Sequence, residues 1–481
     1  MNRRMVVFLL SRILFFEAIL MLPSVIVGLL YREAITWCFL PPIGALLLLG
    51  LFGLKKPKNT AIYAREGFLV VAAAWILMSL FGAIPFWLSG GFDSFWDCIF
   101  EIVSGFTTTG ASILGSVEQL PHCILFWRSF SHWIGGMGVL VFILAVMPMG
   151  GERSMHLMRA EVPGPVVGKL VPRMRDTAII LYGVYTAMTA LLVILLAAGG
   201  MPLFDSICHA FGAAGTGGFS VKNAGIAAYN SAYIDIVLSV FMLLFGVNFS
   251  LYHLILIGKW KNALRSEELR AYFGIVLTAI VLISINIFSR THSLGLTLRH
   301  AFFQVSSIMT TTGYATADFN AWPMFSKVVL LLLMFFGACA GSTGGGLKIS
   351  RLVIFWKASR QEVRKLLHPR AVSVVRMEGK PIGPDLLRST LTFFVMYIGC
   401  LAIGVMLLSL GESNFDTNFS AVLACLSNIG PGIGLVGPTG NYAFFSNGAK
   451  ILLSLEMLAG RLELFPIIML FSPLTYRRKA N

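Results

Sequence analysis

Four short loops combine small hydroxyl or amide residues with a closing glycine. Glycine adopts positive φ without steric cost, which lets successive carbonyl oxygens point to one side. Four such loops around one axis would form an oxygen ring that replaces the water shell of a dehydrated monovalent cation. The candidate cation ligands, given loop by loop, are Thr108, Thr109 and Gly110; Thr216, Gly217 and Gly218; Thr311, Thr312 and Gly313; and Asn428, Ile429 and Gly430.

The apolar segments that lead into these loops share one spacing. A leading residue precedes the closing glycine by thirteen positions in three segments and by fourteen in the last: Asp97, Asp205, His300 and Asp416. Thirteen helical residues cover about 20 Å, which is too short to cross a bilayer core of about 30 Å. Each segment must turn back, and non-helical backbone at membrane depth is tolerated only where it is buried in protein or lines water. The spacing therefore predicts four re-entrant half-helices around an aqueous path.

The leading aspartates have two candidate roles. A carboxylate at a helix start accepts free backbone N–H groups, so we expect helix capping. The alternative is that these carboxylates attract cations to an outer mouth of the path.

The composition requires a lipid environment for these segments. Hydrophobic residues make up 57% of the 481 residues, charged residues only 12%, and the mean hydropathy is +0.81. Typical soluble chains carry about twice that charged fraction. Ten apolar runs of membrane-crossing size are expected, at residues 5–30, 37–54, 68–88, 124–149, 178–198, 234–257, 272–288, 328–347, 391–410 and 451–470.

The basic residues predict the orientation of these runs. Alternate connections hold 28 of the 37 Lys and Arg residues, and all of these connections lie on one face if ten spans alternate. The positive-inside rule places this face and both termini in the cytoplasm. The net charge of +15 is thereby explained without nucleic acid. A docking surface for a soluble partner could overlap with the same basic loops.

The expected fold is an all-α polytopic membrane protein. Two N-terminal helices precede four tandem units, each made of a span, a half-helix, a glycine loop and a second span, around one pseudo-fourfold pore. The expected boundaries are 1–60 for the two leading helices and 61–150, 151–258, 259–360 and 361–481 for the four units.

Several motifs resemble those of a known family. They are SHWIGGMG (Ser131 to Gly138), the four glycine loops, GACAGSTGGGLK (Gly337 to Lys348) and AGRLELF (Ala459 to Phe465). The chain is similar to the potassium transporter superfamily that contains TrkH, TrkG and KtrB, most closely to its TrkH branch. The resemblance implies four membrane-pore-membrane units and potassium as the ion. Because three loops lack a second glycine comparable to the GYG of potassium channels, we expect looser discrimination, with rubidium and, more weakly, sodium admitted.

The eighth run is interrupted by five glycines. Each interior glycine costs a helix about 1 kcal/mol relative to alanine, so we expect an unwound or hinged segment. The resemblance implies that this segment occludes the path below the loops, next to an arginine of the tenth run. The candidate gate residues are Gly341, Ser342, Thr343, Gly344, Gly345, Gly346 and Arg461.

Arg461 is expected to hold this barrier closed through backbone carbonyls and to repel cations, since a buried arginine must be paired or solvated. The alternative for Arg461 is a salt bridge to Glu456 or Glu463. The alternative for the glycines is that they let neighbouring helices pack closely together.

The combined prediction is potassium uptake across a bacterial inner membrane through a gated, channel-like pore, with no enzymatic activity and no cofactor bound by the chain. A proton- or sodium-coupled symporter working by alternating access is the alternative, although broken helices in such carriers usually belong to inverted repeats. The resemblance also implies a homodimer and a cytoplasmic nucleotide-binding ring of the TrkA type. The basic segment 348–388 is the candidate docking face for the ring, and anionic lipid is the other expected partner of the basic loops.

Overall fold

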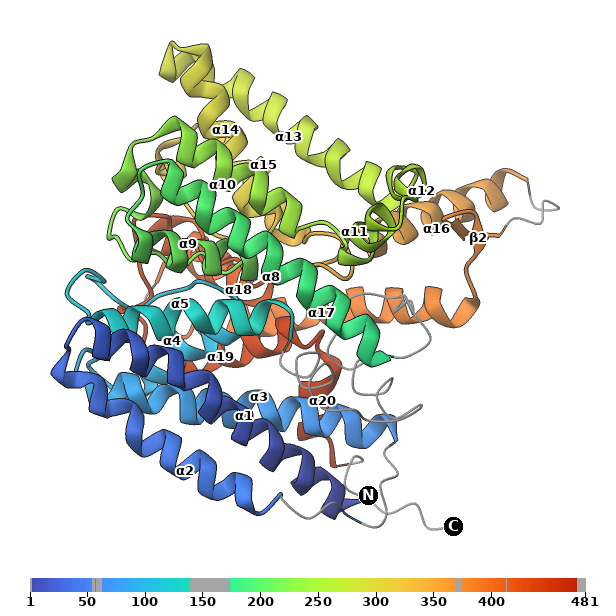
Figure 1. Cartoon of the computed structure of the whole chain (residues 1–481). Helices are drawn as coiled ribbons and strands as arrows, with labels where there is room; N and C mark the ends of the chain where they lie inside the picture. Colours follow the sequence, from blue (N-terminus) through green and yellow to red (C-terminus); the bar gives the residue numbers. More distant parts are fainter. Residues whose placement is uncertain are drawn as a thin grey trace.

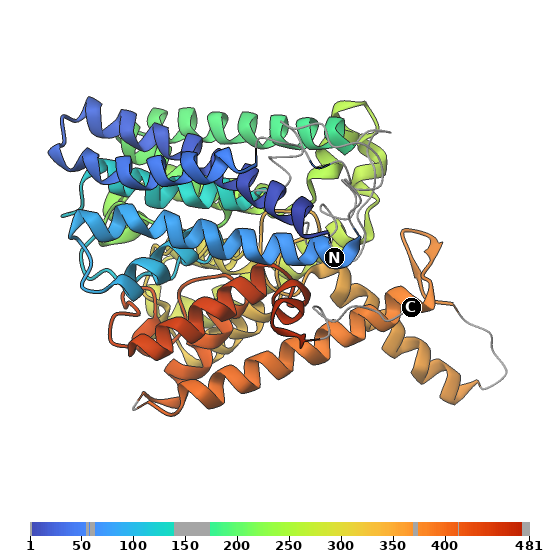
Figure 2. The same cartoon turned by 90° about the horizontal axis from the view of Figure 1, so that it is seen from below.

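The structure is a computed structural model that describes residues 2–53, 57, 63–138, 174–368, 374–411 and 413–473. Within these residues, the only strands are β1 (Arg376–Met377) and β2 (Lys380–Pro381), which pair as an antiparallel hairpin. Most helices run side by side as one bundle (Figure 1). The helix α16 (Ile349–Leu367) and the hairpin project beyond one end of the bundle (Figure 2).

The chain begins with two apolar helical segments that pack against each other. The first is α1 (Arg3–Leu30), and the second is the 3-10 helix η1 (Ala34–Phe39), which continues directly into α2 (Leu40–Leu51). Pro41 lies in the first turn of α2, where a helix needs no backbone N–H donor. This segment therefore tolerates its prolines at the junction of the two helix types.

From α3 onward, one order of elements occurs four times: a long helix, a short helix followed by a glycine loop, and a further helix. The long helices are α3 (Ala64–Ser89), α8 (Met174–Ala198), α13 (Glu267–Thr291) and α17 (Pro384–Leu408). The short helices are α4 (Phe95–Phe106), α9 (Leu203–Gly215), α14 (Leu294–Met309) and α18 (Phe415–Leu426). The further helices are α5 (His122–Gly136), α10 (Ala232–Phe245), α15 (Met324–Phe335) and α19 (Asn447–Arg461).

Shorter elements connect these helices. Three of them follow the further helices: α11 (Phe249–Leu256), α12 (Trp260–Leu264) and α20 (Phe465–Phe471). Single 3-10 turns lie in the connections that follow the glycine loops: η2 (Gly225–Tyr229), η3 (Phe319–Ala321) and η4 (Gly434–Val436).

Six helical segments of the described chain are long and apolar enough to cross a membrane, or seven if the bent pair α10 and α11 is one span. This number is lower than the ten expected apolar runs because several runs are broken. The run at 234–257 bends by 92° between α10 and α11. The run at 328–347 is helical only to Phe335, the run at 451–470 is interrupted after Arg461, and the run at 124–149 extends beyond the described residues.

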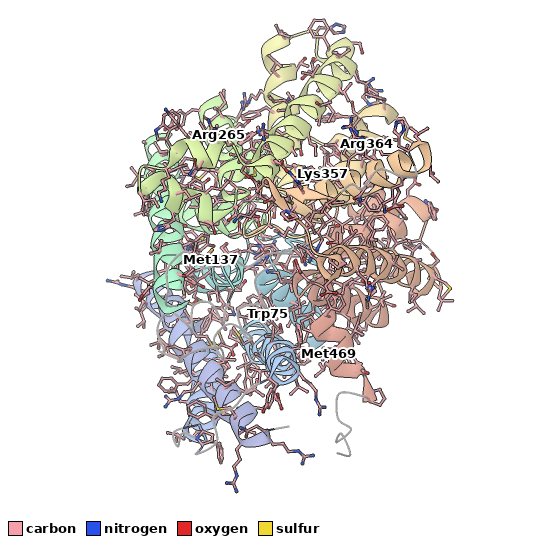
Figure 3. The ribbon with its side chains drawn as sticks, turned by 90° about the vertical axis from the view of Figure 1, so that its right-hand side faces the viewer. Trp75, Met137, Arg265, Lys357, Arg364 and Met469 are labelled. Atoms are coloured by element: carbon pink, nitrogen blue, oxygen red, sulfur yellow. The ribbon has the colours of Figure 1, made fainter. Side chains whose placement is uncertain are left out.

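The surface of the bundle separates apolar sides from a basic end. Leu277, Val281 and Ile285 recur along one face of α13 and are 62%, 55% and 72% exposed, as expected of a helix that faces lipid. At the end of the bundle where α16 projects, which faces the viewer in Figure 3, Arg265 and Arg364 are exposed and Lys357 is part-exposed. This distribution agrees with a membrane protein whose basic residues gather on one side. The basic segment 153–175 lies outside the described residues, apart from the first turn of α8.

Candidate functional site: a ring of four glycine loops

Each predicted loop begins at the C-terminus of a short helix and adopts the same backbone conformation. The chain enters the left-handed region twice, first at a non-glycine residue with φ of 55° to 59° and then at the closing glycine with φ of 71° to 94°. Positive φ is uncommon for residues other than glycine, and such strain concentrates at functional sites. The residues are Thr108 and Gly110, Thr216 and Gly218, Thr311 and Gly313, and Asn428 and Gly430.

The four loops contact one another in cyclic order. A Cβ atom added to any closing glycine would overlap a carbonyl oxygen of the next loop, at the residue just before that loop's own closing glycine. The overlapping pairs are Gly110 with Gly217, Gly218 with Thr312, Gly313 with Ile429, and Gly430 with Thr109. The fourth loop thus returns to the first. Equivalent carbonyl oxygens lie at all four contacts, so the loops form a closed ring.

A cavity of about 180 Å³ lies against this ring, and all four closing glycines line it. The loop after α18 adds Val436 and Gly437, and Arg128 and Lys222 bring positive charge to the wall. Arg128 is neutralised by the buried carboxylate of Glu101, with Nε and Oε1 2.6 Å apart. The four glycines therefore share one space, as a path through the ring requires.

Threonine side chains in the first and third loops brace the loops themselves. The hydroxyls of Thr107 and Thr109 lie 2.8 Å apart, and those of Thr310 and Thr312 also lie 2.8 Å apart. In both loops the first of the two hydroxyls also donates to a helix carbonyl four residues earlier. These hydroxyls are occupied within the protein, so the backbone carbonyls are the better candidate ligands for an ion.

The fourth loop is braced differently. Asn428 Nδ2 donates to Thr109 Oγ1 at 3.0 Å and to the carbonyl oxygen of Met457 at 2.9 Å, which ties the fourth loop to the first loop and to α19. Tyr442 Oη donates to the carbonyl oxygen of Gly430 at 2.6 Å. The carbonyl of Gly430 therefore already has a protein donor for one of its two lone pairs.

The glycine-rich segment of the eighth run is not helical, as the sequence predicted. It leaves α15 after Phe335 and reaches α16 at Ile349, and Gly341 and Gly346 have φ of 68° and 64°. The segment lies directly against the ring: Gly345 N donates to Thr311 Oγ1 at 2.7 Å. A Cβ atom on Gly345 would overlap the carbonyl oxygen of Ser427. We call residues 336–348 the intramembrane loop.

Arg461 contacts this loop at a backbone carbonyl. Its Nη1 donates to the carbonyl oxygen of Thr343 at 2.7 Å, and its Nη2 donates to the carbonyl oxygens of Gly135 and Gly136 at the end of α5. Of the two alternative salt-bridge partners, Glu463 lies 2.5 Å from Arg351 Nη2. Glu456 is buried in α19, and its Oε2 has no hydrogen-bond partner among the described residues. Arg461 thus donates to backbone carbonyls, and one of these lies in the predicted gate segment.

The leading residues of the short helices do not act simply as helix caps. Ser94, not Asp97, is the N-cap of α4, and Asp97 forms a buried ion pair with Lys450 in α19. Asp205 lies in the first turn of α9 and accepts a hydrogen bond from Tyr229 Oη at 2.6 Å. Asp416 lies in the first turn of α18 and is exposed. His300 is not at a helix start at all, because α14 begins six residues earlier at Leu294.

Two further residues shape the intramembrane loop and were not expected from the sequence. Lys348 is buried, and its Nζ donates to the carbonyl oxygen of Gly344. Glu268 Oε1 accepts from the backbone N–H of Ala340 at 2.7 Å and of Ser350 at 3.0 Å, so one carboxylate joins the loop to the first turn of α16. Glu268 lies at the start of α13, and no local sequence pattern connects it to a loop more than 70 residues away.

Within the described residues, no group of three or more His, Cys, Asp or Glu side chains could hold a metal ion. The site is therefore built from carbonyl oxygens, hydroxyls and two buried cations, Lys348 and Arg461. Such a set binds or repels a monovalent cation through weak, reversible interactions.

Comparison with known proteins agrees with a transport protein of this kind. Residues 45–477 match the TrkH family, which is described as a cation transport protein. The chain belongs to this family, which confirms the resemblance noted from its motifs and agrees with the prediction that it is not an enzyme.

Individual relatives cover nearly the whole chain. The chain is 36% identical to the Trk system potassium uptake protein TrkH of Salmonella typhimurium, over 97% of each chain. It is 35% identical to the Trk system potassium uptake protein TrkG of Escherichia coli, over 95% of each chain. Its structure is similar to the crystal structure of the potassium transporter TrkH from Vibrio parahaemolyticus, with a TM-score of 0.89 and 31% identity over 99% of this chain and 100% of the other.

Proposed function

We propose that the chain conducts potassium into the cell through a gated pore whose filter is the ring of four glycine loops. In this proposal, four membrane-pore-membrane units follow two leading helices, and ten spans alternate across the membrane with both termini in the cytoplasm. Potassium is proposed because the relatives are named as potassium uptake proteins or potassium transporters.

The cyclic contact between the loops is the observation that carries this proposal. Each closing glycine lies so close to a carbonyl oxygen of the next loop that no Cβ atom fits. A ring of equivalent carbonyl oxygens offers a dehydrated cation the oxygens that it loses from water. Each short helix directs its C-terminus, with partial negative charge, toward the ring, which adds to the attraction.

The second part of the proposal is that the intramembrane loop is the gate. Arg461 and Lys348 each donate to a carbonyl oxygen of this loop, at Thr343 and Gly344. Two cations beside a cation path also oppose permeation electrostatically while the loop is closed. Opening would then require the loop to leave the ring together with at least one of these contacts.

A membrane potential is sufficient to drive uptake through such a pore. A potential of 100 mV, negative inside, is worth about 2.3 kcal/mol per charge, which supports roughly fiftyfold accumulation. The alternative function is a proton- or sodium-coupled symporter. The repeated order of elements runs in the same direction four times, which favours a pore over the inverted repeats of many carriers.

The proposal is tested by substitutions in the ring. Gly218→Ala and Gly313→Ala place a Cβ atom against a carbonyl oxygen of the next loop at a residue with positive φ. We expect each to abolish potassium flux into proteoliposomes or to reduce potassium over sodium selectivity by at least about tenfold, the equivalent of 1.4 kcal/mol. Gly274→Ala in α13 is the control, because its Cβ atom meets nothing within 4 Å. Unchanged flux and selectivity in both ring variants would contradict the proposal.

Flux measured with the membrane potential clamped separates the two mechanisms. A pore conducts potassium without a proton or sodium gradient and shows single-channel steps in planar bilayers. A strict requirement for one of these gradients would favour the symporter.

We further propose that the basic segment 348–388 receives a cytoplasmic regulatory ring and that the protein works as a homodimer in the inner membrane. The projection of α16 and the hairpin beyond the bundle (Figure 2) supports a docking role for this segment. Deletion of residues 376–381 should remove the response to the ring and its nucleotide while potassium conduction remains.

A further inference from the structure

The second loop of the ring lacks the hydroxyl brace of the first and third loops. Glycines Gly215 and Gly217 occupy the positions of the two bonded threonines, so no side chain of this loop can make the same contact. The loop nevertheless has the same positive φ values as the others, at Thr216 and Gly218. Another part of the chain must therefore hold it in place.

His132 of α5 fills the space beside these glycines. Its side chain is fully buried, and a Cβ atom on Gly217 would overlap its imidazole ring. A Cβ atom on Gly215 would overlap the backbone carbonyl oxygen of His132. Because Gly215 and Gly217 have no Cβ atom, His132 lies closer to the loop than any other two residues at these positions would allow.

Both ring nitrogens of His132 are used. Nδ1 lies 2.8 Å from the carbonyl oxygen of Gly105 in α4, and Nε2 accepts from the backbone N–H of Phe219 at 3.3 Å. A carbonyl oxygen only accepts and a backbone N–H only donates, so the proton must be on Nδ1 and the lone pair on Nε2. The site therefore selects one neutral tautomer, which connects the end of the first short helix to the second loop.

The bond to Phe219 affects the preceding carbonyl directly. Phe219 N belongs to the same planar trans peptide group as the carbonyl of Gly218, and the N–H and C=O of such a group point in opposite directions. An N–H held toward His132 therefore directs the Gly218 carbonyl away from His132. Tyr314 Oη holds the next carbonyl, that of Phe219, at 3.2 Å. The Gly218 carbonyl is thus oriented through its own peptide group, and the peptide group that follows is held by Tyr314.

We propose that His132 is a positioning residue for ion selectivity, because it sets the direction of the Gly218 carbonyl in the second loop. This inference rests on the proposed function of the ring as a filter. His132 does not contact the ion in this proposal; it acts through the Phe219 amide. It replaces the threonine brace that the second loop lacks.

Two substitutions separate the two bonds of His132. Glutamine reaches the position of Nε2 with an oxygen that can accept from Phe219 N, whereas asparagine reaches only the position of Nδ1 and can donate to Gly105. We expect His132→Gln to keep the ratio of potassium to sodium permeability within about threefold of the wild type. We expect His132→Asn and His132→Ala to lower this ratio about tenfold, the equivalent of one hydrogen bond of roughly 1.4 kcal/mol.

The permeability ratios are measured from reversal potentials of purified protein in planar bilayers. His292→Gln, at the exposed end of α13, is the matched control and should equal the wild type. Equal ratios in His132→Gln, His132→Asn and wild type, with Gly313→Ala altered, would overturn the role of His132 and leave the filter intact. Unchanged ratios in Gly313→Ala as well would overturn the filter itself and the inference with it.

A second measurement reads the tautomer of His132 in the wild-type protein itself. Solid-state NMR of ¹⁵N-histidine-labelled wild-type protein, with His132 assigned by comparison with His132→Gln, reports which ring nitrogen carries the proton. We expect the neutral Nδ1–H tautomer. A neutral Nε2–H tautomer or a doubly protonated ring would leave Phe219 N without an acceptor and would overturn the proposal.

Discussion

Asp97 and Lys450 form a buried ion pair, with Oδ1 and Nζ 2.6 Å apart, although 353 residues separate them in the sequence. Asp97 lies in the first turn of α4 and Lys450 in the first turn of α19. The pair joins the first repeat of the element order to the last, at the same junction where the fourth glycine loop contacts the first. The ring is therefore closed by side chains as well as by its backbone.

Loss of one partner of this pair should strongly destabilise the protein. Lys450→Met leaves a carboxylate buried without its counter-charge, and removal of one member of a buried pair typically costs about 3 to 5 kcal/mol. The double substitution Asp97→Leu with Lys450→Met removes both charges, so its stability should return close to that of the wild type. Thermal unfolding in detergent measures both effects.

Lys365→Met provides the control for this pair. Lys365 and Glu362 form an exposed pair on α16, and such pairs contribute about 0 to 1 kcal/mol. A Lys450→Met variant that melts like Lys365→Met would show that the buried pair does not hold the ring together.

The repeated loops were predictable because their signal is local. Positive φ at a fixed position favours glycine, so the closing glycines such as Gly110 and Gly313 mark the loops directly in the sequence. The break in the eighth run was predictable for a related reason, since Gly341 to Gly346 weaken any helix. The break between α10 and α11 was not predicted, because only Gly246 marks it.

Contacts over long distances in the sequence explain most of what was missed. No sequence pattern assigned His132 a role in the loops, because only the folded chain brings its ring to Phe219, 87 residues later. Glu268 reaches the intramembrane loop in the same way, from 72 residues before Ala340. Asp97 was expected to cap its helix, but the partner that determines its role lies at the other end of the chain.

Arg461→Gln should raise potassium flux. The substitution removes a positive charge beside the path and weakens the bond to Thr343, which is worth about 1.5 to 3 kcal/mol for a charged donor. If the bond holds the loop closed, its loss favours the open state by roughly tenfold or more. Rubidium uptake into proteoliposomes measures the change, and Arg360→Gln on the exposed side of α16 should leave uptake unchanged.

Arg461→Lys separates the two roles of the arginine. Lysine keeps the positive charge but cannot contact Thr343 and α5 at once with a planar fork. An increase in uptake similar to that of Arg461→Gln would assign the closed state to the hydrogen bonds, and no increase would assign it to the charge. Lower uptake in both variants, with the protein folded, would contradict a role in closing the path.

The stability of the N-terminal end of α5 should depend on pH through Glu33, which lies between α1 and η1. Burial alone would raise the pKa of Glu33, but hydrogen bonds from the backbone N–H groups of Cys123 and His122 outweigh it and lower the pKa below 4.5. The unfolded chain therefore binds this proton more tightly than the folded protein does. The stabilisation is complete above the unfolded pKa and is lost as the pH falls through the folded pKa.

Glu33→Gln removes this titration. Between about pH 6 and pH 3.5, the melting temperature of the wild type should fall more than that of Glu33→Gln. Glu118→Gln, an exposed residue with no such cluster of backbone donors, should follow the wild type. An identical pH dependence of Glu33→Gln and wild type would contradict the role of this carboxylate.

The start of α13, around Glu268, connects the intramembrane loop to the β1–β2 hairpin. Its neighbours Ser266 and Glu267 both donate to Glu378 Oε1 in the turn of the hairpin, through Oγ at 2.9 Å and the backbone N–H at 2.8 Å. One short stretch at the start of α13 thus contacts the hairpin on one side, and the intramembrane loop and the first turn of α16 on the other. A displacement of the hairpin therefore has a direct route to the intramembrane loop, which is the proposed gate.

Glu268→Ala should therefore raise potassium flux, because Ala340 and Ser350 lose their shared acceptor and the loop loses this tie to α16 and α13. Glu268→Gln keeps an acceptor oxygen and should have a smaller effect. Glu378→Ala removes contacts of the hairpin with Ser266 and Glu267 and no contact of the loop itself, so it should raise flux less than Glu268→Ala.

A Ser342→Cys substitution, made in each of these variants, reports movement of the loop as faster labelling by a thiol reagent. Glu362→Ala, on the exposed face of α16, is the control. Unchanged flux and labelling in Glu268→Ala would show that the loop is held closed without this carboxylate, by Arg461 and Lys348 alone.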